Sequence, residues 1–296
     1  MTAVTATSGR PPRGRAWLRR AFPYLLLAPG IFYLVAFYVL PAVQMFLYSV
    51  SEGTITTGFE RTWNLDNYIF ALTEFPENFA NSFLYGGLAT LLTFLIGFPV
   101  AYFIAFRGGR YKNLLLFMVI APFFTSFLIR TINWKILLGD EGPLLGPLKA
   151  IGLLPPDFSV LFTPLSQTAG LTYNFLPFMI LPLYIALEKI DPRLIEAAGD
   201  LYADRAAVFR RITFPLALPG IFAGTILTFI PAMGDYINAE LLGNPQTRMI
   251  GNVIQSRFLF QNDYPVASAL AFILMAGILV LITIYARALG TEQLTG

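Results

Sequence analysis

Side chains that could carry out chemistry are few in this sequence, and two types are missing. The 296 residues include no cysteine and no histidine, which excludes thiolate nucleophiles, histidine general bases and Cys/His zinc sites. A nucleotide-binding P-loop places its lysine directly after glycine. The four lysines here follow Tyr, Trp, Leu and Glu (Lys112, Lys135, Lys149 and Lys189). We therefore expect no catalytic residue, metal or cofactor on this chain, and any ATP hydrolysis on another one.

The segment 188–215 carries the densest pattern of charged residues. Asp191 followed by Pro192 predicts an N-cap and the first position of a helix, and Asp204 offers a second cap. The segment therefore predicts two short amphipathic helices with a turn near Tyr202, which either dock on a partner protein or lie among lipid headgroups. Apolar residues recur at helical spacing on one face of the first helix, at Leu194, Ala198 and Leu201.

A second set of polar residues lies in or just after apolar segments. Carboxylates beside aromatic rings suit a polyammonium ion, because they supply ion pairs and cation–π contacts. Polar side chains at membrane depth often face the interior of a helix bundle. A loop that meets a partner protein, or hydrogen bonds between helices, would explain the same residues equally well. The candidates for lining a pathway are Tyr173, Asn174, Asp235, Tyr236 and Glu240.

Most of the chain around these residues is apolar. Hydrophobic residues make up 56% and charged residues 12%, whereas soluble domains have about 25% charged residues. A helix needs about 20 apolar residues to cross the hydrocarbon. We predict an all-α integral membrane protein with about six transmembrane helices and a cytoplasmic loop, about 188–215, between the fourth and fifth. The six segments that meet or approach the required length are about 22–48, 82–106, 114–129, 165–187, 214–233 and 266–286.

The third of these segments is the weakest. It is short, and Arg130 and Lys135 interrupt its extension to Leu138. Arg130 is expected to end this span at the outer surface.

Prolines lie within or at the ends of the spans. Each removes a backbone donor and bends its helix. Broken helices suit a pathway that opens and closes, and kinks that only improve packing explain the prolines equally well. The residues are Pro41, Pro99, Pro122, Pro177, Pro182, Pro215, Pro219 and Pro231.

Lysine and arginine are distributed unevenly between the loops. If all six segments cross, 14 of the 20 basic residues fall on the side of both termini, five of them in a basic tail over residues 1–20. Basic residues accumulate on the cytoplasmic side of membrane proteins, so both termini are expected in the cytoplasm. Eleven of the 17 acidic residues fall on the outer side. They would concentrate cations there, unless the asymmetry reflects only the orientation rule.

A motif in the charged loop resembles that of a known family. Glu196-Ala197-Ala198, a turn position and then Ile212-x-Phe214-Pro215 have the spacing of the EAA loop in membrane permeases of bacterial ABC importers. This sequence departs from the family motif at one position, because Tyr202 stands where the family has its turn glycine. The segments 121–130, 176–184, 231–236 and 250–254 resemble the spermidine/putrescine permeases, so the resemblance covers most of the chain from Phe22 onward.

This resemblance implies a permease domain over about 21–290 in the bacterial cytoplasmic membrane, and import of polyamines. The expected partners are an ABC ATPase dimer that holds ATP and Mg, a second homologous permease, an extracytoplasmic solute-binding protein and the lipid bilayer, and no nucleic acid. In that family the Glu of the motif and its helix sit in a cleft of the ATPase. The coupling residues that the resemblance implies are Glu196, Ala197, Ala198, Leu201 and Tyr202.

Other functions remain open at this point. Close relatives in the family carry other small solutes. A secondary transporter driven by an ion gradient would need ionisable residues in mid-span, whereas the acidic residues here cluster in loops. A membrane enzyme without Cys or His would need carboxylate pairs near one interface, and the outer carboxylates are scattered.

Overall fold

The computed structural model describes residue 24 and residues 26–289. The predicted basic tail, residues 1–20, and the start of the first span lie outside the described residues. Five helical segments are long and apolar enough to cross a membrane, and they confirm five of the six predicted spans. They are Leu26–Ser49, Pro76–Arg107, Pro164–Glu188, Arg205–Met233 and Tyr264–Arg287.

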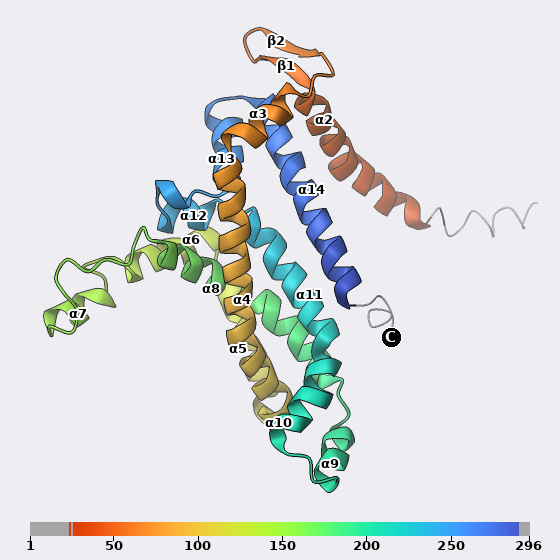
Figure 1. Ribbon diagram of the computed structural model, residues 1–296, viewed down its shortest axis with the longest axis vertical. Coiled ribbons are helices and arrows are strands. Elements are labelled where there is room, and N and C mark those ends of the chain that lie inside the picture. Colours follow the sequence, from red (N-terminus) through yellow and green to blue (C-terminus); the bar gives the residue numbers. More distant parts are fainter. Residues whose placement is uncertain (1–23, 25, 290–296) are drawn as a thin grey trace, which may run out of the picture.

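The chain runs back and forth several times between the two ends of the elongated molecule (Figure 1). The first span includes η1 (Val35–Val39) and α2 (Leu40–Ser49), and an antiparallel hairpin of β1 (Ser51–Thr54) and β2 (Gly58–Arg61) follows. Next come α3 (Asp66–Glu74), α4 (Pro76–Arg107), η2 (Gly109–Tyr111), α5 (Lys112–Ile120), η3 (Ala121–Phe124), α6 (Phe127–Leu137), α7 (Leu145–Ala150) and α8 (Pro164–Glu188). The remainder comprises α9 (Pro192–Asp200), α10 (Arg205–Val208), η4 (Phe209–Thr213), α11 (Phe214–Met233), α12 (Ile237–Leu242), η5 (Pro245–Thr247), α13 (Ile250–Gln255), η6 (Ser256–Phe260) and α14 (Tyr264–Leu289).

The third predicted span differs from the prediction. The helices over Gly109–Phe124 and Phe127–Leu137 form a pair bent by 93°, so a single helix over 114–129 is wrong. The break falls where Thr125 and Ser126 adopt extended ψ angles of 142° and 138°, just after the proline in η3. Arg130 does not end a span at the outer surface either, because it lies inside α6 with only 7% of its surface exposed.

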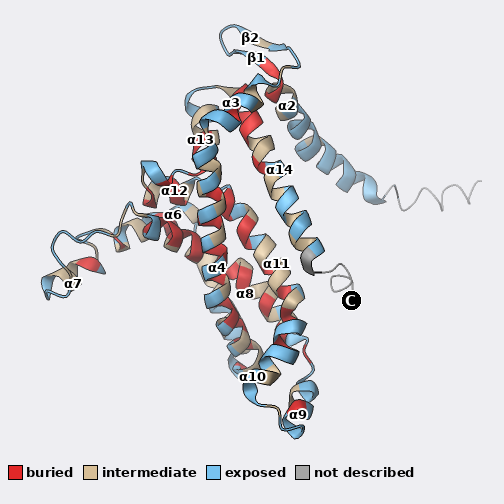
Figure 2. Cartoon of the chain, viewed as in Figure 1, coloured by how far each residue is buried: buried red, intermediate tan, exposed pale blue. Residues whose placement is uncertain are grey.

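The centre of the molecule is the packing of α4, α8 and α11 against one another. Figure 2 shows that buried residues concentrate where these helices meet, while α2 is mostly exposed. Glycine permits the closest approach, since a Cβ on Gly220 of α11 would lie 2.5 Å from the Cβ of Ala186 and 2.7 Å from the carbonyl oxygen of Pro182 on α8. Pro177 and Pro182 stand inside α8 without ending it.

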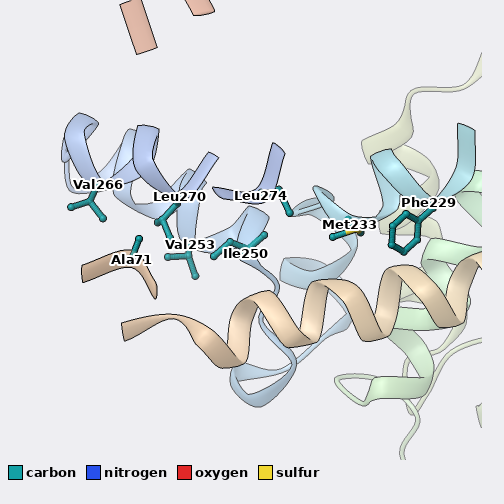
Figure 3. Packing of buried hydrophobic residues seen from close by; sticks show 8 residues of the cluster. All are labelled: Ala71, Phe229, Met233, Ile250, Val253, Val266, Leu270 and Leu274. Atoms are coloured by element: carbon teal, nitrogen blue, oxygen red, sulfur yellow. The ribbon is translucent and has the colours of Figure 1, made fainter. Parts of the chain in front are cut away.

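A second apolar cluster joins the far end of α11 to α3, α13 and α14 (Figure 3). All of its members are nearly or fully buried, so the short helices α3 and α13 are fixed to the spans α11 and α14 by burial of apolar surface. The cluster comprises Ala71, Phe229, Met233, Ile250, Val253, Val266, Leu270 and Leu274.

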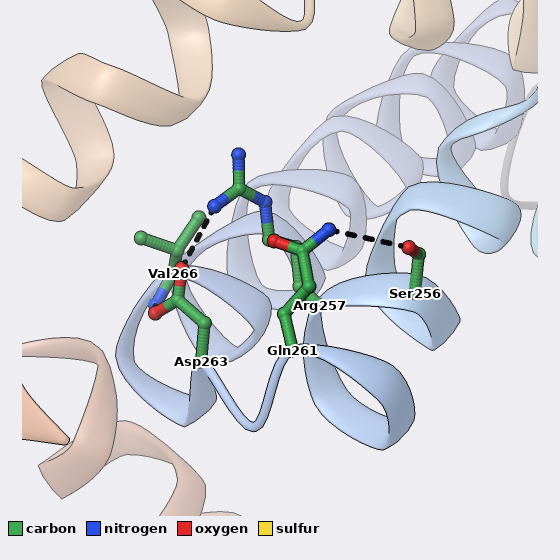
Figure 4. Close-up of polar contacts among 5 residues, drawn as sticks. All are labelled: Ser256, Arg257, Gln261, Asp263 and Val266. Carbon is green, nitrogen blue, oxygen red and sulfur yellow. Dashed lines mark hydrogen bonds and ion pairs between the residues drawn. The ribbon is translucent and has the colours of Figure 1, made fainter.

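An ion pair fixes the start of α14 (Figure 4). The Nη1 atom of Arg257 lies 3.0 Å from a carboxylate oxygen of Asp263, and the other oxygen accepts a hydrogen bond from the backbone N–H of Val266 at 3.3 Å. The guanidinium also lies over the rings of Phe70 and Phe75, at 5.5 and 5.4 Å from their centroids. One arginine therefore links α3, η6 and α14.

We predict that Gly220→Ala lowers the free energy of unfolding of the chain in detergent by about 1–3 kcal/mol, since overpacking a tight contact costs that much. Its thermal midpoint should fall accordingly. Gly87→Ala is the matched control, because a Cβ at Gly87 of α4 would meet no atom within 4 Å. Thermal unfolding followed by intrinsic fluorescence compares the two variants. Equal midpoints for both would show that the α8–α11 contact is not close-packed.

Candidate functional site

The charged loop after α8 forms two capped helices at the end of the molecule opposite the β-hairpin (Figure 1). The carboxylate of Asp191 accepts a hydrogen bond from the backbone N–H of Arg193 at 2.9 Å, and that of Asp204 accepts one from Ala207 at 2.6 Å. Pro192 occupies the first turn of α9. Both caps and both helices confirm the prediction from the sequence.

The turn between α9 and α10 is a Schellman motif with tyrosine at its left-handed position. The N–H of Ala203 donates to the carbonyl of Ala198 at 3.0 Å, and the N–H of Tyr202 donates to that of Gly199 at 3.0 Å. This pattern requires a left-handed residue at Tyr202, where φ is +58°. Glycine usually fills the position, and a residue with a Cβ costs roughly 1 kcal/mol or more there. The turn thus has the backbone geometry that usually requires glycine, although the residue at this position is Tyr202.

The loop residues named from the sequence do not all face the same way. Glu196 and Ala197 are exposed, whereas Ala198 is buried against the chain. Leu201 is 81% exposed and Tyr202 is 99% exposed. The predicted apolar face of α9 is therefore not packed as a unit, because Leu201 at its end is free of contacts that bury it.

Continuous structure connects this loop to the spans. Arg205–Met233 is one helical segment, so α10, η4 and α11 continue into one another. The ring of Phe209 in η4 packs edge-on against Phe98 of α4 with centroids 5.6 Å apart. On the other side of the loop, Lys112 at the start of α5 forms an ion pair of 2.7 Å with Glu188 at the end of α8. The loop is therefore connected directly to α4, α8 and α11.

A buried chain of amide and carboxylate groups joins α6 and α8 to the segment that begins α12. The Nδ2 atom of Asn174 donates to the hydroxyl of Thr131 and to Oδ1 of Asn238, both at 3.0 Å. Asn238 in turn donates to Asp235 Oδ1 from its backbone N–H at 2.7 Å and from its side chain at 3.2 Å. Asp235 is only 9% exposed. Burial raises the pKa of its carboxyl to about 6, and the hydrogen bonds from Asn238 oppose that rise only in part.

Three buried polar atoms, in this network and on the neighbouring Arg130, have no hydrogen-bond partner among the described residues. They are Oδ1 of Asn174 and the Nε and Nη1 atoms of Arg130. The guanidinium of Arg130 lies over the rings of Phe123 and Phe127, at 4.6 and 5.6 Å from their centroids. Cation–π contacts of this kind offset part of the cost of burying a charge, and they connect the two sides of the 93° bend.

The five candidate pathway residues fall into separate groups. Asn174 and Asp235 belong to one buried network, joined through Asn238. Asn252 donates from its side chain to the carbonyl of Tyr236 at 3.0 Å and to a carboxylate oxygen of Glu240 at 3.2 Å.

Glu240 and Tyr173 lie outside this buried network. Glu240 lines a cavity of about 430 Å³ together with Phe162, Asn244 and Arg248. The ring of Tyr173 packs instead on Trp134, with centroids 5.4 Å apart.

Sequence reasoning missed Thr131, Asn238 and the burial of Arg130. The partners of Asn174 are 43 and 64 residues away along the chain, and no local pattern reports such a distance.

Comparison with known proteins settles the family. Residues 93–289 match the family described as binding-protein-dependent transport system inner membrane component. The chain belongs to this family. It is 42% identical over 229 residues to the spermidine/putrescine transport system permease protein PotB of Haemophilus influenzae, covering 77% of this chain and 78% of that protein. It is 36% identical to PotB of Escherichia coli, covering 86% of this chain and 94% of that protein.

Solved structures support the fold of this inner membrane component. A chain from a bacterial ABC transporter involved in the import of the acidic polysaccharide alginate superposes with a TM-score of 0.76 at 20% identity, covering 95% of this chain and all of that one. A chain of the MetNI methionine ABC transporter gives 0.56 at 17% identity, covering 75% of this chain. At these identities the likeness concerns the fold alone.

The buried carboxyl of Asp235 predicts a pH dependence of stability. Its pKa is raised from an ordinary value of 3.8 to about 6 in the folded chain, so the folded state holds the proton more tightly than the unfolded state. The free energy of unfolding should therefore fall as pH rises from about 4 to about 6, by up to about 3 kcal/mol.

Asp235→Asn should remove this slope, and Asp157→Asn, at an exposed position, should leave it in place. Thermal midpoints in detergent between pH 4 and pH 7 measure it. A slope retained in Asp235→Asn would assign it to another group.

Proposed function

We propose that this chain is the transmembrane permease subunit of an ATP-driven importer that carries polyamines such as spermidine and putrescine across the bacterial cytoplasmic membrane. The observation that carries the proposal is the identity of 42% and 36% to two permeases named for these substrates, over most of both chains. The outer excess of acidic residues is compatible with a cationic substrate. Another small solute of similar chemistry is the alternative within the same family.

The complete importer would contain this permease, a second homologous permease, an ATPase dimer and an extracytoplasmic solute-binding protein. Hydrolysis of ATP belongs to the ATPase in this proposal, because no lysine of this chain stands in a P-loop. With the bent pair over 109–137 counted as one broken span, the excess of basic residues on one side favours both termini in the cytoplasm. The α9–α10 loop then lies on the same side as the ATPase.

The α9–α10 loop is the coupling element in this proposal. Glu196 and Ala197 are exposed on α9 and available to a partner, whereas Ala198 supports the turn from inside. When the ATPase pair closes, the docked loop would move with it. The helical segment Arg205–Met233 and the Lys112–Glu188 ion pair would carry this motion into α11, α8 and α5. This is gating by displacement of rigid parts.

The pathway residues have different roles in this proposal. Tyr236 and Glu240 are exposed, so they are the candidates for direct contact with ammonium groups through cation–π contact and ion pairing. Asn252 donates to the backbone carbonyl of Tyr236 and to the carboxylate of Glu240, so it holds the backbone of the first and the side chain of the second. Asp235 and Asn174 are buried in the network with Asn238, which supports the segment at the end of α11. Tyr173 would position α6 through Trp134.

The test is ATP-dependent uptake of labelled spermidine by the complete transporter in proteoliposomes. Glu196→Arg should lower the uptake rate at least about tenfold, since a misplaced charge in a docking interface costs more than 1.4 kcal/mol. Glu60→Arg is the matched control, because Glu60 is an exposed glutamate on the β-hairpin at the other end.

Uptake at the wild-type rate by Glu196→Arg would remove the loop from the mechanism. Uptake by this chain alone, without an ATPase, would favour a secondary carrier.

A further inference from the structure

We propose that the groove between α2 and the β-hairpin binds one anionic phospholipid, with the lipid phosphate on Arg61 and an acyl chain along α2. The residues that line this groove belong neither to the α9–α10 loop nor to the candidate pathway. The inference rests on the membrane-spanning helices, and it is independent of the solute that the transporter carries.

The groove is a cavity of about 630 Å³ with a wall from each element. On the hairpin, strand residues alternate between two faces, so Phe59 and Arg61 share the face that lines the cavity. Glu60 lies between them and belongs to the opposite face, where it pairs in register with Glu52. The wall from α2 has the spacing of one helix face and includes Leu40, Val43, Gln44 and Tyr48.

The length of the groove matches one leaflet of a bilayer. Leu40 and Tyr48 are eight positions apart, which is about 12 Å along a helix axis, and one leaflet contributes about 15 Å of hydrocarbon. Leu40 and Val43 are 58% and 48% exposed. This apolar face lies on a helix long enough to cross the membrane, so lipid acyl chains are its natural cover.

Aromatic side chains mark the membrane boundary at one end of the groove. The rings of Tyr48, Phe59 and Tyr264 pack on one another, with centroids 5.1, 5.8 and 5.6 Å apart. Tyrosine is enriched at the level of the lipid headgroups. Arg61 follows Phe59 by two residues on the same strand face and therefore lies near the depth of the phosphates. With the N-terminus in the cytoplasm, as proposed above, this is the outer leaflet.

Two polar side chains of the groove have no partner within the described part of the chain. The guanidinium of Arg61 forms no ion pair or hydrogen bond there, and the amide of Gln44 forms no hydrogen bond. A guanidinium binds phosphate through two parallel hydrogen bonds. Gln44 lies one turn deeper than Tyr48, where its amide can donate to an ester carbonyl. An anionic lipid neutralises Arg61, whereas a zwitterionic headgroup brings its own cation.

The test is a competition between two lipids for the complete transporter in mild detergent. Phosphatidylglycerol and phosphatidylcholine of equal chain length are added at equal concentration, and native mass spectrometry counts the lipids retained. The wild type should prefer phosphatidylglycerol. Arg61→Gln should lower this preference about fivefold, which is the contribution of one basic side chain near a membrane surface. Arg61→Lys keeps the charge and should stay within about twofold of wild type.

Two further variants separate the charge from the groove. Arg248→Gln is the matched control, because Arg248 is an exposed arginine outside this groove, near the start of α4, and the preference should not change. Val43→Trp fills the groove while Arg61 stays intact, and it should lower the binding of phosphatidylglycerol.

Equal retention of both lipids by the wild type, an unchanged preference in Arg61→Gln, or an equal loss in Arg248→Gln would each overturn the lipid site. Undiminished binding in Val43→Trp would overturn the place of the acyl chain along α2. These outcomes leave the proposed function standing, because uptake of labelled spermidine tests that function separately.

Discussion

The structure depends on one constraint, which is that backbone polar groups in a bilayer need partners from within the protein. Long helices meet this need by themselves. Where the helices break, at Thr125 and Ser126 and again after Met233, the chain has to supply other support. The buried network of Thr131, Asn174 and Asn238 lies between these two breaks, and the cation–π contacts of Arg130 cross the first of them. This network thus joins α6 and α12, which follow the two interruptions, to the continuous helix α8.

The closely packed helices differ from the exposed loop that a partner could contact. The α4–α8–α11 packing is close enough that single glycines define the helix separation. The α9–α10 loop, by contrast, touches the body mainly through its continuation into α11 and through the residues that flank it. In the proposed function, a loop that continues into a span and has an exposed tip would pass the displacement of an ATPase on to the spans.

Much of this arrangement could be predicted from the sequence, because its signals are local. Apolar length predicts five spans, although the second and fifth of the six predicted segments begin six and nine residues later than the observed helical segments. Asp191 and Asp204 predict the two caps of the loop. The 93° bend could not be predicted, since hydropathy reports how apolar a segment is and not its direction. Arg130 illustrates the same limit. A basic residue after an apolar run is typical of a span end, but Phe123 and Phe127 provide it with a buried site. The left-handed conformation of Tyr202 is visible from the sequence only through its alignment with a glycine in the related loop motif.

The most direct test of the central claim uses the absence of cysteine from the sequence. A cysteine introduced at Ala197 is the single thiol of the chain, and a short thiol-to-amine cross-linker then reports its neighbours in the assembled transporter. The account predicts a cross-link from Ala197→Cys to the ATPase subunit, and none to that subunit from the same substitution at Glu60 on the hairpin. A transporter that imports its substrate while Ala197→Cys never cross-links to the ATPase would contradict the account, because the α9–α10 loop would then not be the docking element.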